Sequence, residues 1–338
     1  MKRVLTILAL IISATALIAV AVASTGTPPG YAFIIFVQGA FGDKAQWMQT
    51  LSLTIPLLLT GLSVAVALRA GLFNIGAEGQ LLVGGLMGAW TGYAFVLPYG
   101  LHLGLVLIVG ALAGAIWALP AGLIKAWRGG HEVITTIMLN YLALNLVNYL
   151  LNGPMRAVSA FNEPKTPELM RSAWMPMLSF TDNSLSLGIL VGIFVAIGLW
   201  VWLFRTPNGY ETRAVGANSN AAKAHGISIS RTLIMTMALS GALAGLAGAV
   251  LVAGVPEHRF YRDFSPGYGF DGIAVGLLAG ANPLGVIPAA VVFGAVDSGT
   301  RYMESLTSVP RDIAVVVRGL IILGVAGLTW QRKKGSAK

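Results

Sequence analysis

The 338-residue chain contains no cysteine and few charged residues, and each shortage excludes a class of protein. Without cysteine there is no disulfide framework, no thiol nucleophile and no cysteine-ligated metal site. Only 10% of the residues are charged, whereas an average soluble protein has about 25%. The composition therefore argues against a soluble globular domain.

Motifs for nucleotide or metal chemistry are also missing. No G-x-x-x-x-G-K-[ST] segment occurs, so the chain has no P-loop. His131-Glu132 is not followed by a second histidine at the spacing of a zinc-protease helix, and the four histidines are scattered, so we predict no metal site. We expect neither enzyme activity nor a cofactor bound by this chain.

Hydrophobic residues make up 56% of the chain, and 42 residues are glycine. Glycine is commoner in membrane helices than in soluble ones. The first apolar run, Val4–Ala23, ends in an A-x-A sequence typical of a signal-peptide cleavage site. It is nevertheless longer than a signal core of about 7–15 residues and matches the ~20 residues that span a bilayer. We favour an uncleaved first helix.

Nine further apolar runs follow, which predicts an all-α polytopic membrane protein with about ten transmembrane helices. They are Thr50–Leu68, Gln80–Leu97, Leu101–Ile124, Val133–Leu151, Leu185–Phe204, Thr232–Ala253, Gly272–Ala281, Leu284–Gly299 and Ile313–Trp330. The run Gly272–Ala281 is too short to cross a bilayer alone, so we expect a half-helix joined to irregular backbone. The polar segment Asn152–Ser184 is long enough for a small external cap or lateral helix.

The basic residues predict the orientation of the chain. With the N-terminus inside, thirteen Lys and Arg fall on the inner side and eight on the outer side. This excess on the inner side follows the positive-inside rule, which explains the net charge of +9 better than nucleic-acid binding does. Both termini are expected to be cytoplasmic, in a protein of the inner, cytoplasmic membrane.

Small residues recur at four-residue spacing, as in G-x-x-x-G, and predict close helix packing. The pairs are Gly84 with Gly88, Gly110 with Gly114, Gly241 with Gly245, and Ala244 with Gly248. Such spacing lets helix backbones approach closely in lipid, and it carries no information on a substrate.

The run Val133–Leu151 carries Asn140, Tyr141, Asn145 and Asn148, with Asn152 just after it. At about 100° per residue these side chains lie within an arc of about 140°. Polar groups in a membrane face the protein interior or a water-filled path. These side chains either form hydrogen bonds that hold helices together or line a translocation path, and we favour the path.

Four charged residues lie within or beside apolar runs: Glu78, Asp271, Asp297 and Arg318. A charge at the bilayer centre is costly, so partners are expected, and the pairs Asp297–Arg318 and Arg69–Glu78 are candidates. A proton or ion relay is the alternative, which would make the chain a secondary transporter. We favour structural or path-lining roles and add Asn74, Glu78 and Asp271 to the candidate path.

The basic segment between Arg205 and Arg231 predicts a loop that contacts another protein. Ser219 or Asn220 is suited to begin a short helix through Ala221-Ala222-Lys223-Ala224-His225, and Gly226 is suited to stop it. Because this helix is small and polar, we expect it to dock outside its own bundle. The alternative is a solvated loop that serves topology only.

The segments Gly71–Gln80 and Gly267–Ala274 form an internal echo. Each pairs an aromatic residue with Asn or Asp, then glycine, just before a Gly/Ala-rich apolar run. The first is predicted on the inner side and the second on the outer side, as an inverted repeat requires.

Four stretches, in this order, resemble the permeases of ABC importers. They are LFNIGAEGQ (Leu72–Gln80), TPNGYETRAVG (Thr206–Gly216), Ala221-Ala222 with Gly226-Ile227, and GYGFDGIAV (Gly267–Val275). The resemblance covers nearly the whole chain. It is to the ribose, galactose and branched-chain amino acid permease group, and within it to the bacterial nucleoside and simple-sugar branch.

The resemblance implies a type II importer fold with an inverted repeat. One permease domain, 1–338, then divides into a first helix and outer loop (1–49), a first repeat (50–151), an outer segment with the sixth helix and coupling loop (152–231), a second repeat (232–330) and a basic cytoplasmic tail (331–338). The implied function is nucleoside import. The alternatives are import of a simple sugar such as ribose or galactose, or an ion-coupled carrier.

The resemblance also implies partners. They are a cytoplasmic ATPase that uses the ATP, a second permease subunit in a heterodimer, and an extracytoplasmic substrate-binding protein. The coupling helix that sits on the ATPase would lie at Asn218–Gly226. The implied coupling residues are Arg213, Asn218, Ser219, Asn220, Ala221, Ala222, Lys223, His225 and Gly226.

Overall fold

The computed structural model describes residues 16, 18–158, 163–179, 184–310, 312, 313, 315, 316 and 319. The chain divides into two compact units, each described here by itself. One unit comprises Met1–Thr54, Ser179–Leu185 and Val291–Lys338, and the other comprises Ile55–Leu178 and Ser186–Ala290. The predicted spans at 4–23 and 313–330 lie mostly outside the described residues.

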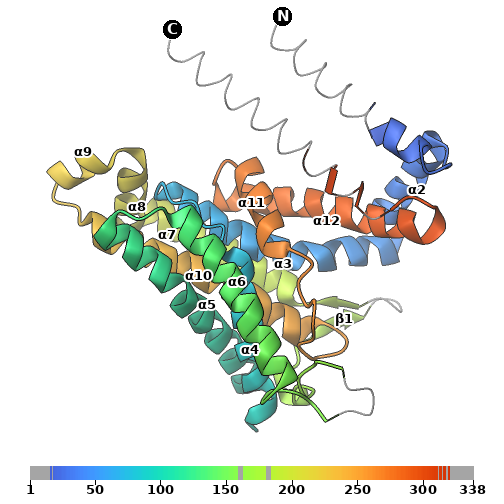
Figure 1. Ribbon diagram of the computed structural model, residues 1–338, viewed down its shortest axis with the longest axis horizontal. Helices are drawn as coiled ribbons and strands as arrows, with labels where there is room; N and C mark the ends of the chain where they lie inside the picture. The colour runs from blue at the N-terminus through green and yellow to red at the C-terminus, as the bar shows by residue number, and fades with distance from the viewer. Residues whose placement is uncertain are drawn as a thin grey trace, which may run out of the picture. The chain divides into compact units, whose positions relative to one another are not determined.

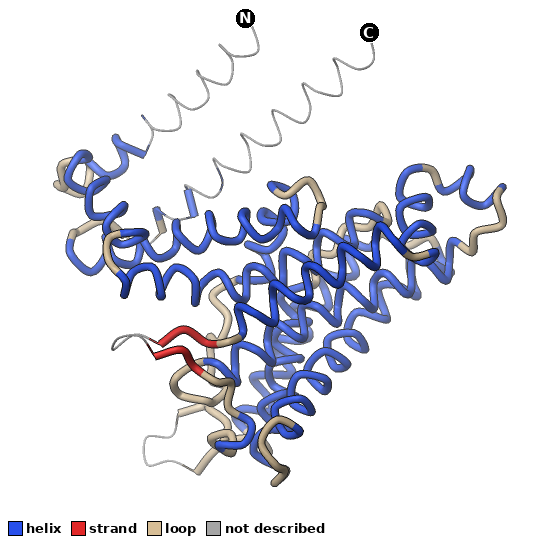
Figure 2. The backbone as a smooth tube through the Cα atoms, turned by 180° about the vertical axis from the view of Figure 1, so that it is seen from behind, coloured by secondary structure: helices blue, strands red, loops and turns tan. Residues whose placement is uncertain are grey.

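Helices make up nearly all of the described structure (Figures 1 and 2). They are α2 (Pro29–Phe41), α3 (Lys44–Arg69), α4 (Ala77–Ala94), α5 (Leu101–Arg128), α6 (Glu132–Asn152), α7 (Gly188–Arg205), α8 (Pro207–Ala217), α9 (Ser219–Ala224), α10 (Ile229–Gly254), α11 (Tyr268–Leu278) and α12 (Pro283–Leu306). A 3-10 turn, η1 (Arg171–Ala173), and a two-stranded sheet of β1 (Met177–Ser179) and β2 (Ser184–Ser186) complete the list.

Six of the described helices are long and apolar enough to cross a membrane: α3, α5, α6, α7, α10 and α12. This confirms a mostly helical, multi-pass membrane protein. Helix α11 has only 11 residues, which at 1.5 Å per residue is well short of a ~30 Å hydrocarbon core. The prediction of a short helix at this place is therefore confirmed.

Two helices were not predicted. Helix α2 has 13 residues and lies in what the sequence suggested was an outer loop. Helix α8 begins where the Thr206 hydroxyl accepts a hydrogen bond from the Gly209 N–H (3.2 Å), with Pro207 in the first turn. Conversely, the described part of the outer segment 152–184 forms η1 and the small sheet, and contains no lateral α-helix.

In the larger unit, α4, α5 and α10 pack backbone to backbone. A Cβ at Gly84 of α4 would overlap the backbone of Gly245 in α10, and a Cβ at Gly114 of α5 would overlap Gly241 and Gly245. Gly248 of α10 likewise lies against the Leu81 carbonyl. The interpretation of the small-residue pairs as packing surfaces is confirmed, and only glycine permits these contacts.

In the smaller unit, α2 packs against α12. Gly39 lies directly against the Tyr302 side chain, and the Ser298 hydroxyl donates to the Gly39 carbonyl at 2.8 Å. The apolar side chains Ala32 and Ile35 of α2 are buried in the same cluster as Met303 of α12. Helix α2 is therefore an integral part of this unit.

Candidate functional site

The turn before α4 is built by the side chains of its own motif. The Asn74 carbonyl oxygen accepts hydrogen bonds from the Gly76 N–H (2.9 Å) and from the Gln80 amide (3.1 Å). The Asn74 amide donates to Gln80 (2.8 Å) and to the hydroxyl of Ser240 in α10 (2.8 Å). Ser240 in turn donates to the Ser63 carbonyl of α3 (2.7 Å). Asn74 is buried, so its donors and acceptors are satisfied inside the protein.

The first turn of α4 meets the first turn of α11. The Glu78 carboxylate accepts a hydrogen bond from the Gly269 N–H at 2.7 Å. A Cβ at Gly269 would overlap the backbone of Ala77 and Glu78, so glycine is required for the approach. A negative charge at a helix N-terminus is favourable because the N-terminal N–H groups carry partial positive charge. The two halves of the sequence echo are therefore in direct contact.

Asn140 joins α6 to the start of α4. Its carbonyl oxygen accepts from the Gly79 N–H (2.9 Å), and its amide donates to the Ile75 carbonyl (2.9 Å). A Cβ at Gly79 would stand 2.9 Å from the Asn140 oxygen, so this glycine leaves room for the amide. Asn140 is 8% exposed, and its bond to the Gly79 N–H is buried, whereas its bond to the Ile75 carbonyl is partly buried.

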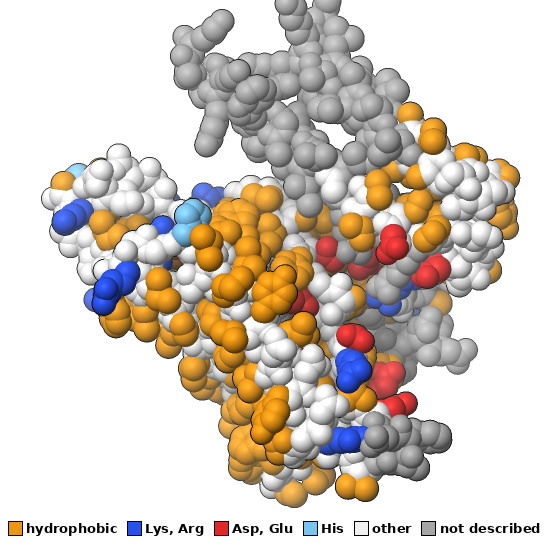
Figure 3. Space-filling model, viewed as in Figure 1, with side chains coloured by type: hydrophobic (Ala, Val, Ile, Leu, Met, Phe, Trp, Pro, Cys, Tyr) orange, Lys and Arg blue, Asp and Glu red, His pale blue; other side chains and the backbone are white. Residues whose placement is uncertain are grey.

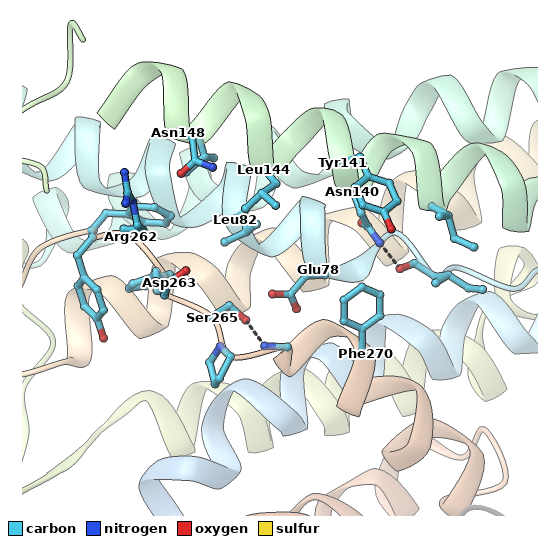
Figure 4. Close-up of a pocket in the computed structure, with 18 residues that line it drawn as sticks. Glu78, Leu82, Asn140, Tyr141, Leu144, Asn148, Arg262, Asp263, Ser265 and Phe270 are labelled. Atoms are coloured by element: carbon cyan, nitrogen blue, oxygen red, sulfur yellow. Dashed lines mark hydrogen bonds between the residues drawn. The ribbon is translucent and has the colours of Figure 1, made fainter. Parts of the chain in front are cut away.

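These contacts form one wall of a cavity of about 570 Å³. Helix α6, the start of α4 and the segment 260–270 enclose it (Figure 4). Its polar side chains are Glu78, Asn140, Tyr141, Asn148, Arg262, Asp263 and Ser265. Aromatic side chains also line it, among them Tyr141, which is 61% exposed, and Phe270, which is 48% exposed.

The segment 260–270 has an unusual backbone at the cavity. Asp263 has a φ of +60°, which is uncommon for residues other than glycine. The Ser265 hydroxyl accepts from the N–H groups of Gly267 (3.3 Å) and Tyr268 (3.2 Å) and so caps the start of α11. Sequence reasoning missed Arg262, Asp263, Ser265 and Phe270, although Phe270 belongs to the second echo motif.

The structure brings some of the predicted path residues to the cavity and not others. Glu78, Asn140, Tyr141 and Asn148 line it. Asn145 points away, is exposed, and donates to the Tyr141 carbonyl one turn earlier (2.8 Å). Asn74 and Asp271 are not among the lining residues. On the helical wheel Asn145 lies about 40° beyond Tyr141, the last lining position on that side.

The predicted pair Arg69–Glu78 is wrong. Glu78 bonds to the start of α11, whereas the Arg69 guanidinium donates to the carbonyls of Ala281 (2.7 Å) and Gly280 (3.3 Å) just after the end of α11. The negative Glu78 therefore interacts with the N-terminal end of α11, and the positive Arg69 interacts with its C-terminal end. The other suggested pair includes Arg318, which lies outside the described residues.

The predicted coupling helix is present as α9, but its cap differs. The Asn218 side chain accepts from the Ala221 N–H (3.1 Å), so the cap is Asn218 and neither Ser219 nor Asn220. Gly226 has a φ of +80° and ends the helix as expected. Ala222 is buried in an apolar cluster that also contains Val215 of α8 and Leu233 of α10. The prediction that the whole helix docks outside its bundle therefore needs correction, because one face is buried.

The remaining coupling candidates lie on the solvent side of this segment. Ser219, Asn220, Ala221, Lys223 and His225 are exposed. Arg213 lies over the Phe204 ring of α7, with 5.0 Å between the guanidinium carbon and the ring centroid. Helix α9 lies at one end of the helices α5, α6 and α10, and residues 153–158 and 163–178 lie at the other (Figure 1).

A multi-pass helical protein with a cavity lined by its helices has an architecture that suits membrane transport. Residues 47–326 match the family described as the permease component of branched-chain amino acid transport systems. The chain belongs to this family of transport-system permeases, and it is a transport subunit rather than an enzyme.

Three similar proteins are permease proteins of ABC transporters. The guanosine permease NupP of Bacillus subtilis (strain 168) is 41% identical, with 85% of this chain and 83% of the relative covered. The nucleoside permease NupB of Lactococcus lactis subsp. cremoris (strain MG1363) is 35% identical, with 96% and 91% covered. The glucose permease TsgB13 of Haloferax volcanii is 34% identical, with 93% and 84% covered. The resemblance drawn from the sequence motifs is confirmed.

Asn140 and Asn145 provide a matched test of whether the Asn140 side chain holds α6 to the start of α4. Asn140→Ala should lower the free energy of unfolding by about 1–3 kcal/mol, because it leaves buried backbone groups of Ile75 and Gly79 unpaired. Asn145→Ala should change it by less than about 0.5 kcal/mol, because that amide is exposed. Thermal unfolding of the two purified variants measures the difference. Equal melting temperatures would show that Asn140 does not hold α4 to α6.

Proposed function

We propose that this chain is one permease subunit of an ATP-driven importer that carries nucleosides across the cytoplasmic membrane. The observation that carries the proposal is the similarity over most of the chain to NupP and NupB, whose names specify guanosine and nucleosides. The glucose permease TsgB13 matches at a lower identity than NupP does, 34% against 41%. A sugar importer is therefore the second candidate.

The chemistry of the cavity supports a nucleoside better than a sugar. A nucleoside has a flat aromatic base and a ribose with hydroxyl groups. Tyr141 and Phe270 offer aromatic faces on which a base can stack, an arrangement that nucleic-acid-binding proteins also use. Glu78 and Asn148 offer acceptors for ribose hydroxyls or base N–H groups. A sugar would use the polar groups but not both rings.

The partner proposal rests on named pairs among the relatives. NupQ, a second guanosine permease protein of the same Bacillus subtilis strain, matches this chain at 28% against 41% for NupP. This difference supports a heterodimeric pore in which our chain is the NupP-like half. A separate cytoplasmic ATPase would supply the ATP hydrolysis, and an extracytoplasmic binding protein would deliver the substrate.

The finer architecture is also part of the proposal. The two echo motifs each begin a helix, α4 and α11, and these helices pack start to start. This contact between two similar motifs supports an inverted repeat, and the proposal of about ten transmembrane helices, with Gly267–Ala274 on the outer side, rests on the apolar runs of the sequence. Lys and Arg side chains gather at the end that carries α8 and α9 (Figure 3), which supports a cytoplasmic position for this end. The cytoplasmic position of both termini is proposed from the distribution of basic residues along the sequence.

Substrate class is tested by uptake into proteoliposomes that contain the complete importer. We expect ATP-dependent uptake of radiolabelled adenosine or guanosine. Excess unlabelled nucleoside should abolish it, whereas excess ribose, galactose or glucose should leave it within about two-fold. Omission of the ATPase, with an ion gradient imposed, is the control for a secondary transporter. Competition by sugar alone would favour the second candidate, and uptake without ATPase would overturn both.

Helix α9 provides the test of coupling. Ala221 is exposed, so Ala221→Glu should leave the fold intact and lower uptake about ten-fold, which corresponds to a loss of ~1.4 kcal/mol of contact with the ATPase. Asn208→Glu places the same charge on the exposed start of α8 and should leave uptake unchanged. Ala222→Leu should instead lower the melting temperature, because Ala222 is 4% exposed. Normal uptake by Ala221→Glu would count against coupling through α9.

A further inference from the structure

A cluster of arginines at the end of α7 has no part in the transport site. The guanidinium carbons of Arg69 and Arg213 lie 5.6 Å and 5.0 Å from the centroid of the same ring, that of Phe204. Arg205, the next residue, lies over the ring of Trp200 at 5.9 Å. Three cations from α3, α7 and α8 therefore converge on two aromatic rings of one helix.

The positive charge of this cluster is not neutralised by the described part of the chain. The ion pairs among the described residues join Lys125 to Glu132, Lys165 to Glu163 and Arg259 to Glu168. None of them includes an arginine of the cluster. The Arg213 Nε is buried and has no hydrogen-bond acceptor among the described residues. A buried guanidinium donor without a partner is costly, so an external acceptor is expected.

The backbone holds the two arginines together. Gly216 at the end of α8 lies directly against the Arg69 carbonyl, where any Cβ would overlap it. The Arg69 side chain is oriented by its hydrogen bonds to the carbonyls of Ala281 and Gly280. Both guanidinium groups lie over the Phe204 ring. A preformed pair of this kind suits the bidentate recognition of a phosphate group.

The surface next to the cluster identifies the source of the phosphate. Helix α7 is apolar and long enough to span a membrane. Its exposed side chains Leu190, Phe194, Ile197 and Val201 lie within an arc of about 60°, and Phe204 continues the same face. Acyl chains that cover this face would end at Phe204. Aromatic residues and arginines at the end of a membrane helix are typical of the headgroup level.

We propose that Arg69 and Arg213 bind the phosphate of an anionic phospholipid whose acyl chains lie along the exposed face of α7. Arg205 and Phe204 complete the site. The lipid would hold the end of α7 to α3 and to α8, the helix that precedes α9. This site is separate from the nucleoside cavity and does not depend on the proposed substrate.

The test uses the full-length chain in mixed micelles that contain phosphatidylglycerol and phosphatidylcholine at equal mole fractions. Native mass spectrometry counts the lipids that each chain retains. We expect retention of phosphatidylglycerol in preference to phosphatidylcholine. Arg213→Gln should lower this retention about five-fold, because each arginine near a membrane surface contributes roughly this factor. Phe204→Leu, which keeps all the charges, should lower it less.

Arg231→Gln is the matched control, because it removes one exposed cation from the first turn of α10. It should leave lipid retention unchanged. Arg213→Lys should recover part of the retention, which separates loss of charge from loss of fold. Equal retention by Arg213→Gln and Arg231→Gln would overturn the proposal. So would displacement of the lipid by millimolar inorganic phosphate, which would indicate a free-anion site. Unchanged lipid retention with lost binding of the ATPase would assign the cluster to that protein.

Discussion

The contact between the first turns of α4 and α11 is the constraint on which the cavity depends. The Glu78 carboxylate accepts a hydrogen bond from the Gly269 N–H. Because Gly269 has no side chain, the backbone of α11 can lie directly against the backbone of α4. This contact fixes the end of the segment 260–270 and the start of α11, whereas the beginning of the segment is held by hydrogen bonds between Phe260 and Thr166. Other residues of the motif stabilise the same region, because the side-chain amides of Asn74 and Gln80 hydrogen-bond each other across the turn before α4. The carboxylate is then left at the edge of the cavity.

A chain of close contacts connects this cavity with α9. Ala222 of α9 is buried in the same apolar cluster as Val215 of α8 and Leu233 of α10. Helix α10 packs backbone to backbone against both α5 and α4. A force applied to α9 by a partner would therefore reach the first turn of α4 through contacts that have little room to deform. Helix α6, the opposite wall, is joined to that turn by the Asn140 amide.

The sequence predicted the long apolar helices well because their length and composition are set by the membrane. It missed α2 because 13 apolar residues are too few to span a bilayer, so the criterion of about 20 residues rejects them. It missed α8 because that helix is polar, although Thr206 and Pro207 carry the signal of a helix start. The glycine pairs were correctly assigned to packing, since their role depends only on spacing and size.

The cavity was less predictable. Helical periodicity grouped Asn140, Asn145 and Asn148 on one face, but it cannot tell which amide meets the backbone of another helix. That distinction depends on the position of α4, which brings Ile75 and Gly79 to Asn140 and leaves Asn145 exposed. Arg262 and Asp263 were missed for the same reason. They reach the cavity through an irregular segment whose path no periodic pattern encodes.

The most direct test of the cavity as the transport path uses the natural absence of cysteine. Asn148→Cys gives this chain a single thiol, placed at the cavity, and Asn145→Cys gives it one on the same helix outside the cavity. The rate of reaction with a small charged thiol reagent is measured with and without guanosine. The account predicts that guanosine slows labelling at Asn148→Cys several-fold and leaves labelling at Asn145→Cys unchanged. Equal labelling of Asn148→Cys with and without guanosine would contradict it.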